Sequence, residues 1–319
     1  MPESSFLNVG LAQIAPVWLN RTATLAKVVA AIREAADQGC RLVVFGEACV
    51  PGYPNWLSVT GGAVFNDTRQ KEIFDAYSRE AVCLERGDCD AVCRAAAEAG
   101  IAVYLGIIER PRDRGGQSLY CSFVYVNEQG RIASVHRKLQ PTYEERLVWS
   151  PGDGHGLRVH ELDDFRVGGL NCWENWMPLA RSALYAQGCT VHVACWPGSD
   201  RNTRDITRFI AMESRAYVLS VSCLLRREDI ADDLPHAETI RANLPAGWIH
   251  NGGSCVAAPD GSWLLEPQTD REGVFVAQLD LSFVRRERQN FDPSGHYARP
   301  DVTRLSVNRK RQSMLDLTD

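Results

Sequence analysis

The chain has 319 residues, of which 45% are hydrophobic and 24% charged, a composition typical of a globular protein with a large core. The net charge of −5 and the pI of about 5.9 provide no basic field, so we expect no nucleic-acid partner. No stretch approaches the roughly 18 consecutive apolar residues of a membrane helix, and residues 1–5 do not resemble a secretory signal, so we expect no membrane contact. The eleven scattered cysteines are then expected to be reduced thiols in a cytoplasmic protein.

Strands and helices are predicted in alternation from the N-terminus. The apolar run 6–14 predicts a strand, and apolar residues at helical spacing predict a helix over 22–38. A short β-branched run over 41–45 predicts the next strand. The same pattern recurs as a helix over 88–99 and a strand over 101–108. This order of elements indicates α/β layers.

The remaining predicted elements include neighbouring strands as well as helices. Runs 119–126 and 131–135 flank an Asn-Glu-Gln-Gly turn and predict a hairpin, which indicates mixed sheets. Further strands are predicted over 165–170, 190–195, 217–224, 254–258 and 273–279, and further helices over 177–187 and 203–216. Because no linker or repeat interrupts this pattern, we predict a single domain over 1–305. The polar tail over 306–319 is expected to be frayed and solvated, or to reach a neighbouring subunit.

Glu47 is the first candidate for a functional side chain, because it directly follows the strand predicted over 41–45. Sites in open α/β sheets form at the carboxyl ends of strands, whereas the alternative for this carboxylate is a local cap or ion pair. The loop that follows, residues 50–56, has two prolines around a glycine, which fix its path. Tyr53 and Trp56 in this loop are expected to wall a pocket.

A second polar cluster follows the strand predicted over 131–135. Taken alone it is a charged run of the kind usually found on a solvated face. Lys138, however, offers a fixed cation, which is useful where negative charge develops during a reaction. Glu145 lies seven residues later, beyond Pro141, and is expected to turn back toward this lysine.

Cys172 ends the strand predicted over 165–170 and precedes the helix predicted over 177–187. A thiol just before a helix N-terminus is favoured as thiolate, although most of the eleven cysteines are expected to be inert core residues. An activated thiol needs a base and a group that stabilises the product charge. Because Glu47, Lys138 and Cys172 each follow a strand, we expect them to converge on one rim of a sheet. There they suffice for acyl-transfer-like chemistry without a metal.

The three clusters, in this order, resemble the motifs of the nitrilase superfamily, and of its nitrilase branch in particular. The similar segments run from Phe6 to Leu305 and so cover nearly the whole chain. Three long motifs in one order are highly specific. The segments that carry the resemblance are Phe45-Gly46-Glu47 with Pro51-Gly52-Tyr53-Pro54, His136-Arg137-Lys138-Leu139 with Pro141-Thr142 and Glu145-Arg146-Leu147-Val148-Trp149, Cys172-Trp173-Glu174-Asn175, and Gly295-His296-Tyr297-Ala298-Arg299-Pro300-Asp301.

The resemblance implies an α/β fold arranged as a four-layer α-β-β-α sandwich. It implies a nitrilase that converts an organic nitrile and two waters to a carboxylic acid and ammonia, with no cofactor and no metal. It assigns Cys172 as nucleophile, Glu47 as general base, Lys138 as the stabilising cation and Glu145 as the residue that positions this lysine. It also implies self-association as a dimer or a larger homo-oligomer. In the dimer, the two subunits pair through helices.

Two features depart from the family pattern. Gly46 stands where proline is expected before the glutamate, which we expect to loosen the backbone beside Glu47. The tail after Leu305 has 14 residues, fewer than in many nitrilases. Because long tails support spiral oligomers in this family, the short tail argues against an extended assembly.

Six further side chains are predicted to bind the substrate. Five are aromatic and favour an aryl or arylalkyl nitrile. The sixth, a glutamate, follows the candidate nucleophile in the third motif, which favours nitriles over amides by resemblance. These residues are Tyr53, Trp56, Trp149, Trp173, Glu174 and Trp196.

Four alternatives remain open from the sequence. An amidase of the same superfamily would use the same residues on an amide. A cysteine hydrolase with a histidine base would use His136. A metal protein would use the clustered thiols of Cys83, Cys89 and Cys93, although zinc needs a fourth ligand. A non-catalytic binding protein on the same fold is the fourth alternative.

Overall fold

Two mixed sheets form the centre of the computed structural model, which describes residues 5–315. The first sheet has the strand order β13-β1-β2-β3-β4-β5. Strands β1, β2 and β3 run parallel, whereas β13, β4 and β5 pair antiparallel with their neighbours. Its strands are β1 (Phe6–Gln13), β2 (Leu42–Phe45), β3 (Ala102–Glu109), β4 (Tyr120–Val126), β5 (Ile132–Arg137) and β13 (Gly273–Asp280).

The second sheet has the order β10-β11-β9-β8-β7-β6, and β12 pairs with β11. Strands β7, β8 and β9 run parallel to one another, and the outer strands pair antiparallel. The prediction of mixed sheets is therefore confirmed. The strands are β6 (Val159–Leu162), β7 (Phe165–Asn171), β8 (Val191–Trp196), β9 (Tyr217–Ser222), β10 (Leu224–Arg226), β11 (Trp248–Ala257) and β12 (Trp263–Thr269).

The inner faces of the two sheets pack against each other in one apolar core. Leu11, Val44 and Phe123 of the first sheet contribute to the same buried cluster as Val193 and Leu219 of the second. All five side chains are essentially inaccessible to solvent. Burial of this apolar area is the main favourable contribution to folding and fixes the sheets face to face.

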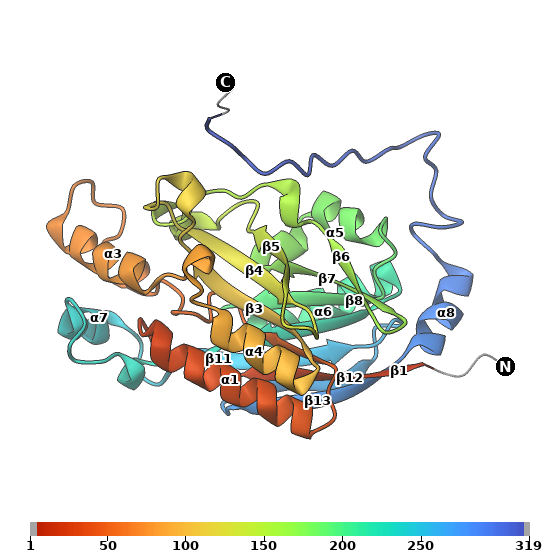
Figure 1. The fold of residues 1–319 in the computed structure, drawn as a ribbon, viewed down its shortest axis with the longest axis horizontal. Coiled ribbons are helices and arrows are strands. Elements are labelled where there is room, and N and C mark those ends of the chain that lie inside the picture. The colour runs from red at the N-terminus through yellow and green to blue at the C-terminus, as the bar shows by residue number, and fades with distance from the viewer. Residues whose placement is uncertain (1–4, 316–319) are drawn as a thin grey trace.

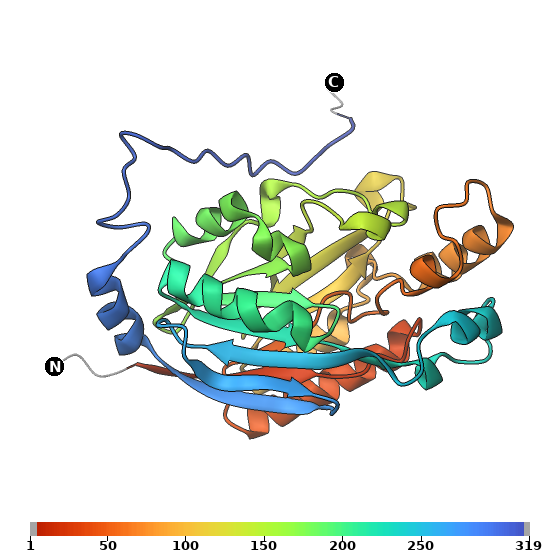
Figure 2. The same cartoon turned by 180° about the vertical axis from the view of Figure 1, so that it is seen from behind.

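Helices cover the two outer faces and complete four layers, as the resemblance implies. Figure 1 shows α1 and α4 in front of the first sheet, and Figure 2 shows α5 and α6 on the opposite side. Within the described part of the chain, no helix is both long and apolar enough to cross a membrane. The helices are α1 (Arg21–Asp37), α2 (Trp56–Val59), α3 (Thr68–Glu80), α4 (Asp90–Ala99), α5 (Pro178–Tyr185), α6 (Asp200–Ser214), α7 (Ala237–Asn243) and α8 (Leu281–Asn290).

The predicted elements are present, with ends that shift by a few residues. Seven further elements were not predicted: α2, α3, α7, α8, β6, β10 and β12. Helix α3 is an instructive case, because it buries only a narrow stripe around Ile73 and Tyr77 and is otherwise polar. It lies beside α7 at one end of the molecule, where His236 Nε2 is 2.7 Å from Glu72 Oε2.

Gly46 lies where the two sheets approach closely, and the expectation of a loosened backbone is wrong. A Cβ atom added at this position would lie 2.6 Å from Cys223 Sγ and 2.9 Å from the Trp196 carbonyl oxygen. The next residue, Glu47, donates its backbone N–H to that same Trp196 oxygen at 3.0 Å. The glycine thus permits a close contact that holds the backbone beside Glu47 in place.

Residues 306–315 of the predicted tail form no helix or strand. The expectation that the tail is frayed is nevertheless wrong for part of this segment. Arg311 contacts Asp153 at 3.1 Å and donates to the Val135 carbonyl oxygen at 3.0 Å. Gln312 donates its backbone N–H to the same Asp153 carboxylate at 2.9 Å. These contacts hold the segment across the end of β5, as the long trace in Figure 1 shows. The last four predicted tail residues, 316–319, lie outside the described residues.

We predict that Gly46→Ala lowers the free energy of unfolding by about 1–3 kcal/mol, because the added methyl group overpacks a contact made partly of backbone. Urea denaturation followed by circular dichroism measures this change. Gly168→Ala is the matched control, since its Cβ would lie 3.2 Å from the nearest atom, a valine methyl group, and should cost less. Equal stability of Gly46→Ala and the wild type would contradict the proposed contact.

Candidate active site

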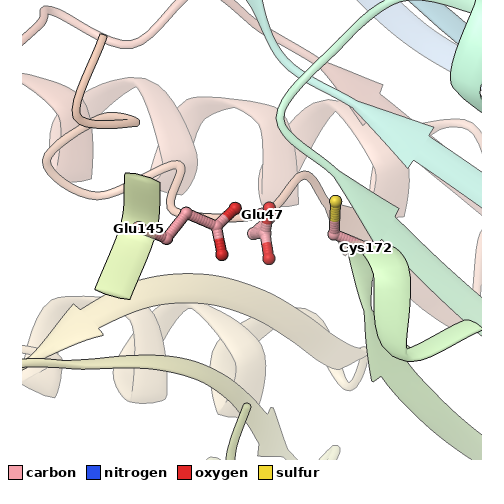
Figure 3. Close-up of side chains that lie close together, drawn as sticks. All are labelled: Glu47, Glu145 and Cys172. Carbon is pink, nitrogen blue, oxygen red and sulfur yellow. The ribbon is translucent and has the colours of Figure 1, made fainter. Parts of the chain in front are cut away.

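Four predicted residues meet in a buried cluster at the carboxyl ends of three strands. Glu47 follows β2, Lys138 follows β5 and Cys172 follows β7. Glu145 comes from the short 3-10 helix η3 (Tyr143–Leu147). Figure 3 shows the carboxylates of Glu47 and Glu145 and the thiol of Cys172 directed toward a common space. All four side chains belong to residues that are at most 3% exposed.

The Lys138 ammonium group lies between two carboxylates. Its Nζ donates to Glu47 Oε1 at 2.8 Å and to Glu145 Oε2 at 2.7 Å. The carboxylates are held in turn by other groups, because the Tyr53 hydroxyl donates to Glu145 Oε1 at 2.9 Å and the Cys121 thiol lies 3.4 Å from Glu47 Oε1. This arrangement gives the ammonium group a fixed position.

Glu47 has the properties of a base that works near neutral pH. Its second oxygen, Oε2, is buried and has no hydrogen-bond partner among the described residues. Burial raises the pKa of the Glu47 carboxyl to about 7, against the opposing effect of Lys138. A carboxyl with this pKa is partly ionised at neutral pH and accepts a proton readily.

The same burial acts on the cation and the thiol of the cluster. Burial alone would lower the pKa of Lys138, but the Glu47 and Glu145 carboxylates raise it well above its ordinary value, so the side chain stays protonated. Burial and the charge of Glu47 raise the pKa of the Cys172 thiol. The expectation of a resting thiolate is therefore wrong. The thiol needs a base to accept its proton at the moment of attack.

Cys172 has a left-handed backbone conformation with a φ of 45°, which is unfavourable for a residue with a side chain. It begins the 3-10 helix η5 (Cys172–Trp176) directly after β7. Asn175 Nδ2 donates to the Cys172 carbonyl oxygen at 2.9 Å and to that of Leu170 at 3.2 Å. This sharp turn places the thiol at the end of the strand, next to the two carboxylates.

Glu174 connects the segments of Lys138 and Cys172 and does not line the cavity beside Cys172, so its predicted substrate-binding role is corrected. Its carboxylate accepts the backbone N–H of Asn171 at 2.8 Å and that of Leu139 at 2.5 Å. It also lies 3.1 Å from His136 Nε2. Burial opposes ionisation of Glu174, but His136 and these amides lower its pKa. The carboxylate therefore ties the turn after Lys138 to the turn before Cys172.

The His136 contact bears on the alternative of a cysteine hydrolase with a histidine base. Its Nε2 is directed to Glu174, and the groups around Cys172 are the carboxylates of Glu47 and Glu145. The geometry favours a carboxylate base over an imidazole.

A cavity of about 340 Å³ opens beside Cys172. Most of the side chains along its wall are polar or charged, and two are aromatic. The lining residues are Tyr53, Pro54, Asn55, Ser58, Thr142, Glu144, Glu145, Cys172, Trp173, Pro197, Gly198, Ser199, Asn202, Ile249 and His250.

Two of the five aromatic residues predicted to wall a pocket lie along this cavity. Tyr53 and Trp173 line the cavity. Trp56 and Trp196 are fully buried in apolar clusters, and they belong to the core. Trp149 lies behind the cavity, where its ring packs edge-on against Tyr53 at 5.6 Å and faces the Lys138 ammonium at 5.5 Å. A sequence pattern does not distinguish a core tryptophan from a pocket tryptophan.

Several residues of the site were not found from the sequence. Cys121 contacts Glu47 from β4, and nothing in its surroundings along the chain marks it. Asn202 and His250 reach the cavity from distant segments, again without a local signal. Asn55 directly follows the first motif and Thr142 belongs to the second, so their positions near Tyr53 and Glu145 in the sequence could have indicated them.

One group of metal-ligating atoms exists within residues 5–315. Atoms of Glu47, Glu145 and Cys172 lie within 4.8 Å of one another. Two of these side chains already bind the Lys138 ammonium, so a metal ion would have to compete with this cation. The cysteines proposed as an alternative metal site do not form such a group among the described residues. These are Cys83, Cys89 and Cys93.

A buried thiol beside a cavity, with an unpaired carboxylate oxygen and a fixed ammonium group next to it, is the arrangement of a hydrolytic enzyme, here built on an α-β-β-α sandwich. The model of the carbon-nitrogen hydrolase family matches residues 8–289. The chain belongs to this family, in its nitrilase branch.

Named relatives support this assignment, and a solved structure shares the fold. The chain is 35% identical over 321 residues to nitrilase 2 from an unknown prokaryotic organism, covering 100% of this chain and 98% of that protein. It is 36% identical over 305 residues to an aliphatic nitrilase of Sinorhizobium fredii (strain HH103), covering 94% and 95% of the two chains. The crystal structure of a carbon-nitrogen hydrolase from Helicobacter pylori G27 has the same fold, with a TM-score of 0.70, 19% identity and coverage of 93% and 97%.

We predict that Glu174→Gln lowers the free energy of unfolding by about 2–5 kcal/mol. The buried Glu174 carboxylate accepts hydrogen bonds from two backbone N–H groups and contacts His136, and a neutral glutamine side chain cannot replace this charge. Urea denaturation of the variant measures this loss. Glu161→Gln is the matched control: Glu161 pairs with Arg166 on the surface, its side chain is 80% exposed, and its loss should change stability by less than about 0.5 kcal/mol. Equal effects of the two substitutions would contradict the bracing role of Glu174.

Proposed function

We propose that this enzyme hydrolyses an organic nitrile to the carboxylic acid and ammonia, with Cys172 as nucleophile. The observation that carries the proposal is the Lys138 ammonium group, fixed at 2.8 Å and 2.7 Å from two carboxylates beside a buried thiol. The nitrilase names of the most similar relatives support the choice of a nitrile as substrate.

In the first step the Cys172 proton passes to the free Oε2 of Glu47 while the sulfur attacks the nitrile carbon. The nitrogen gains a proton from the cluster and a covalent thioimidate forms. Negative charge develops on that nitrogen during the attack, next to the Lys138 ammonium, which stabilises it. Since the donor is already fixed by Glu47 and Glu145, little reorganisation is needed when the charge appears.

The thioimidate is hydrolysed in two further steps. A first water, deprotonated by Glu47, adds to the carbon, and the resulting tetrahedral intermediate expels ammonia and leaves a thioester. A second water attacks the thioester, releases the carboxylic acid and returns the proton to the Cys172 sulfur. The covalent route divides one difficult hydrolysis into easier steps, each served by the same base.

Glu145 acts on Lys138 in this scheme. Its Oε2 accepts from the ammonium group and from the backbone N–H of Thr142 at 2.6 Å, and its Oε1 accepts from the Tyr53 hydroxyl. With both oxygens occupied, Glu145 is well placed to hold the lysine and less suited than Glu47 to abstract a proton.

We also propose that residues 1–305 form one catalytic domain with residues 306–319 as its tail, and that the enzyme works in the cytoplasm as a homo-oligomer without a cofactor or metal. The eleven cysteines are all unpaired, which fits a reducing compartment. Self-association is supported by large exposed apolar side chains on and beside α5 and α6. These are Trp176, Met177, Leu179, Phe209 and Met212.

The decisive experiment measures ammonia release from a panel of aromatic, arylacetic and aliphatic nitriles and from the matching amides, with acid and amide products separated. We expect acid and ammonia from nitriles, faster than from amides, and none above background with Cys172→Ala. Ammonia from amides alone would replace the proposal by the amidase alternative. Turnover by Cys172→Ala would contradict the assigned nucleophile.

We predict an acidic limb in the pH profile of kcat/KM with an apparent pKa of about 7. The pKa of the Glu47 carboxyl is raised to about 7, and only its ionised form accepts the thiol proton, so activity is present above this pH and lost below it. Steady-state rates between pH 5 and 9 in buffers of constant ionic strength test the prediction. A profile that stays flat down to pH 5 would exclude Glu47 as the base.

A further inference from the structure

The wall of the cavity carries both hydrogen-bond donors and acceptors. Several of its polar hydrogens are already used within the protein: the Tyr53 hydroxyl donates to Glu145, the Ser58 hydroxyl to the Asn55 carbonyl oxygen at 3.1 Å, and one Asn202 Nδ2 hydrogen to the Gly198 carbonyl oxygen at 3.0 Å. Asn202 keeps its Oδ1 as an acceptor and its second Nδ2 hydrogen as a donor. The Tyr53 and Ser58 oxygens can still accept a hydrogen bond from a donating group on the substrate.

Glu144 is the charged residue of this wall that does not belong to the catalytic cluster. It lies on η3, directly before Glu145, and its side chain is half-buried along the cavity. Among the described residues its carboxylate has neither a hydrogen bond nor an ion pair, in contrast to the neighbouring Glu145. A half-buried carboxylate without a counter-ion attracts a cation or a hydrogen-bond donor strongly.

His250 presents a neutral acceptor at the same cavity. Its Nε2 lies 2.9 Å from Asn55 Oδ1, and the Asn55 amide group donates from Nδ2 to the Tyr53 carbonyl oxygen at 3.2 Å. The Asn55 oxygen therefore accepts from His250, which places the ring proton on Nε2 and leaves Nδ1 with a lone pair. Burial keeps the ring uncharged, since it lowers the pKa of His250 to about 4.

The charged groups around the cavity also favour a positively charged substrate. None of its lining residues is a lysine or an arginine. In the catalytic cluster one ammonium group, that of Lys138, faces the carboxylates of both Glu47 and Glu145. Arg146 lines the adjoining groove, which Glu144 also borders, and its Nε donates to the Pro141 carbonyl oxygen at 3.1 Å. An anionic substrate would enter this field unfavourably.

We propose that the cavity selects nitriles that carry a positively charged or hydrogen-bond-donating group, an ammonium group above all, which Glu144 binds. The inference rests on the proposed nitrilase function and names its substrate class. It replaces the preference for aryl nitriles predicted from tryptophans, of which three lie away from the cavity wall. Glu144 is a specificity-determining residue in this account and takes no part in the chemical steps.

Three aliphatic nitriles with the same three-carbon spacer test the proposal. They are 4-aminobutanenitrile, whose amine is protonated at neutral pH, pentanenitrile, which is neutral, and 4-cyanobutanoate, which is anionic. We expect kcat/KM of the wild-type enzyme to fall in this order, with at least a tenfold difference between the ammonium nitrile and the anionic one. Rates are measured as ammonia release at constant ionic strength, since long-range charge effects are screened by salt.

The decisive variant is Glu144→Gln, which keeps the shape of the side chain and removes its charge. We expect the ratio of kcat/KM for 4-aminobutanenitrile to that for pentanenitrile to fall roughly tenfold, because a charge-assisted hydrogen bond is lost. Glu144→Asp, which keeps the charge, should retain part of the ratio. Glu266→Gln removes the same charge from an exposed position on β12 and should leave the ratio unchanged within about twofold.

Each outcome decides the question. An unchanged ratio in a folded Glu144→Gln enzyme, or a wild-type enzyme that prefers pentanenitrile or 4-cyanobutanoate, would overturn the proposed specificity while leaving the nitrilase function intact. Release of ammonia from none of the nitriles, including those of the broad panel, would overturn the proposed function and the specificity with it. Circular dichroism of each variant verifies that it is folded.

Discussion

The ion pairs of the buried Lys138 ammonium group with Glu47 and Glu145 hold the rest of the site in place. Removing a charge from water costs several kcal/mol, and this cost is offset only if partners of opposite charge are placed accurately around it. Glu47 and Glu145 provide these partners from two distant segments, at 2.8 Å and 2.7 Å. The need to hold three buried charges together constrains the loops after β2 and β5 and the short helix η3. Cys172 then completes the site from the other sheet.

The sandwich meets this constraint because its two sheets are packed through one core and joined directly at the site. Gly46 allows the loop of Glu47 to touch the backbone of the second sheet, and Glu174 ties the turn after Lys138 to the turn before Cys172. Catalytic groups that come from both sheets are thereby kept in one rigid frame. Such pre-organisation allows a fixed cation to stabilise charge as it develops.

Burial also sets the protonation states of the groups in the site. It raises the pKa of the Cys172 thiol and brings that of Glu47 to about 7, so the resting pair is a thiol next to a carboxyl that ionises near neutral pH. In the proposed mechanism the nucleophile therefore forms together with the attack, by transfer of its proton to Glu47. The wider cavity has a different character, since its unpaired charge is that of Glu144. In the proposed function the inner cluster carries out the reaction, and the outer wall selects the nitrile.

Apolar periodicity and long motifs are local properties of the chain, so the class of fold, the main strands and helices, the family and the four polar residues of the cluster could be predicted without coordinates. Features that depend on contacts between distant segments could not. Glu174 connects two turns by hydrogen bonds, and Gly46 lies at a close contact between the sheets. Trp56 and Trp196 are core residues. The raised pKa of Cys172 and the cavity positions of Asn202 and His250 likewise follow from burial and long-range packing.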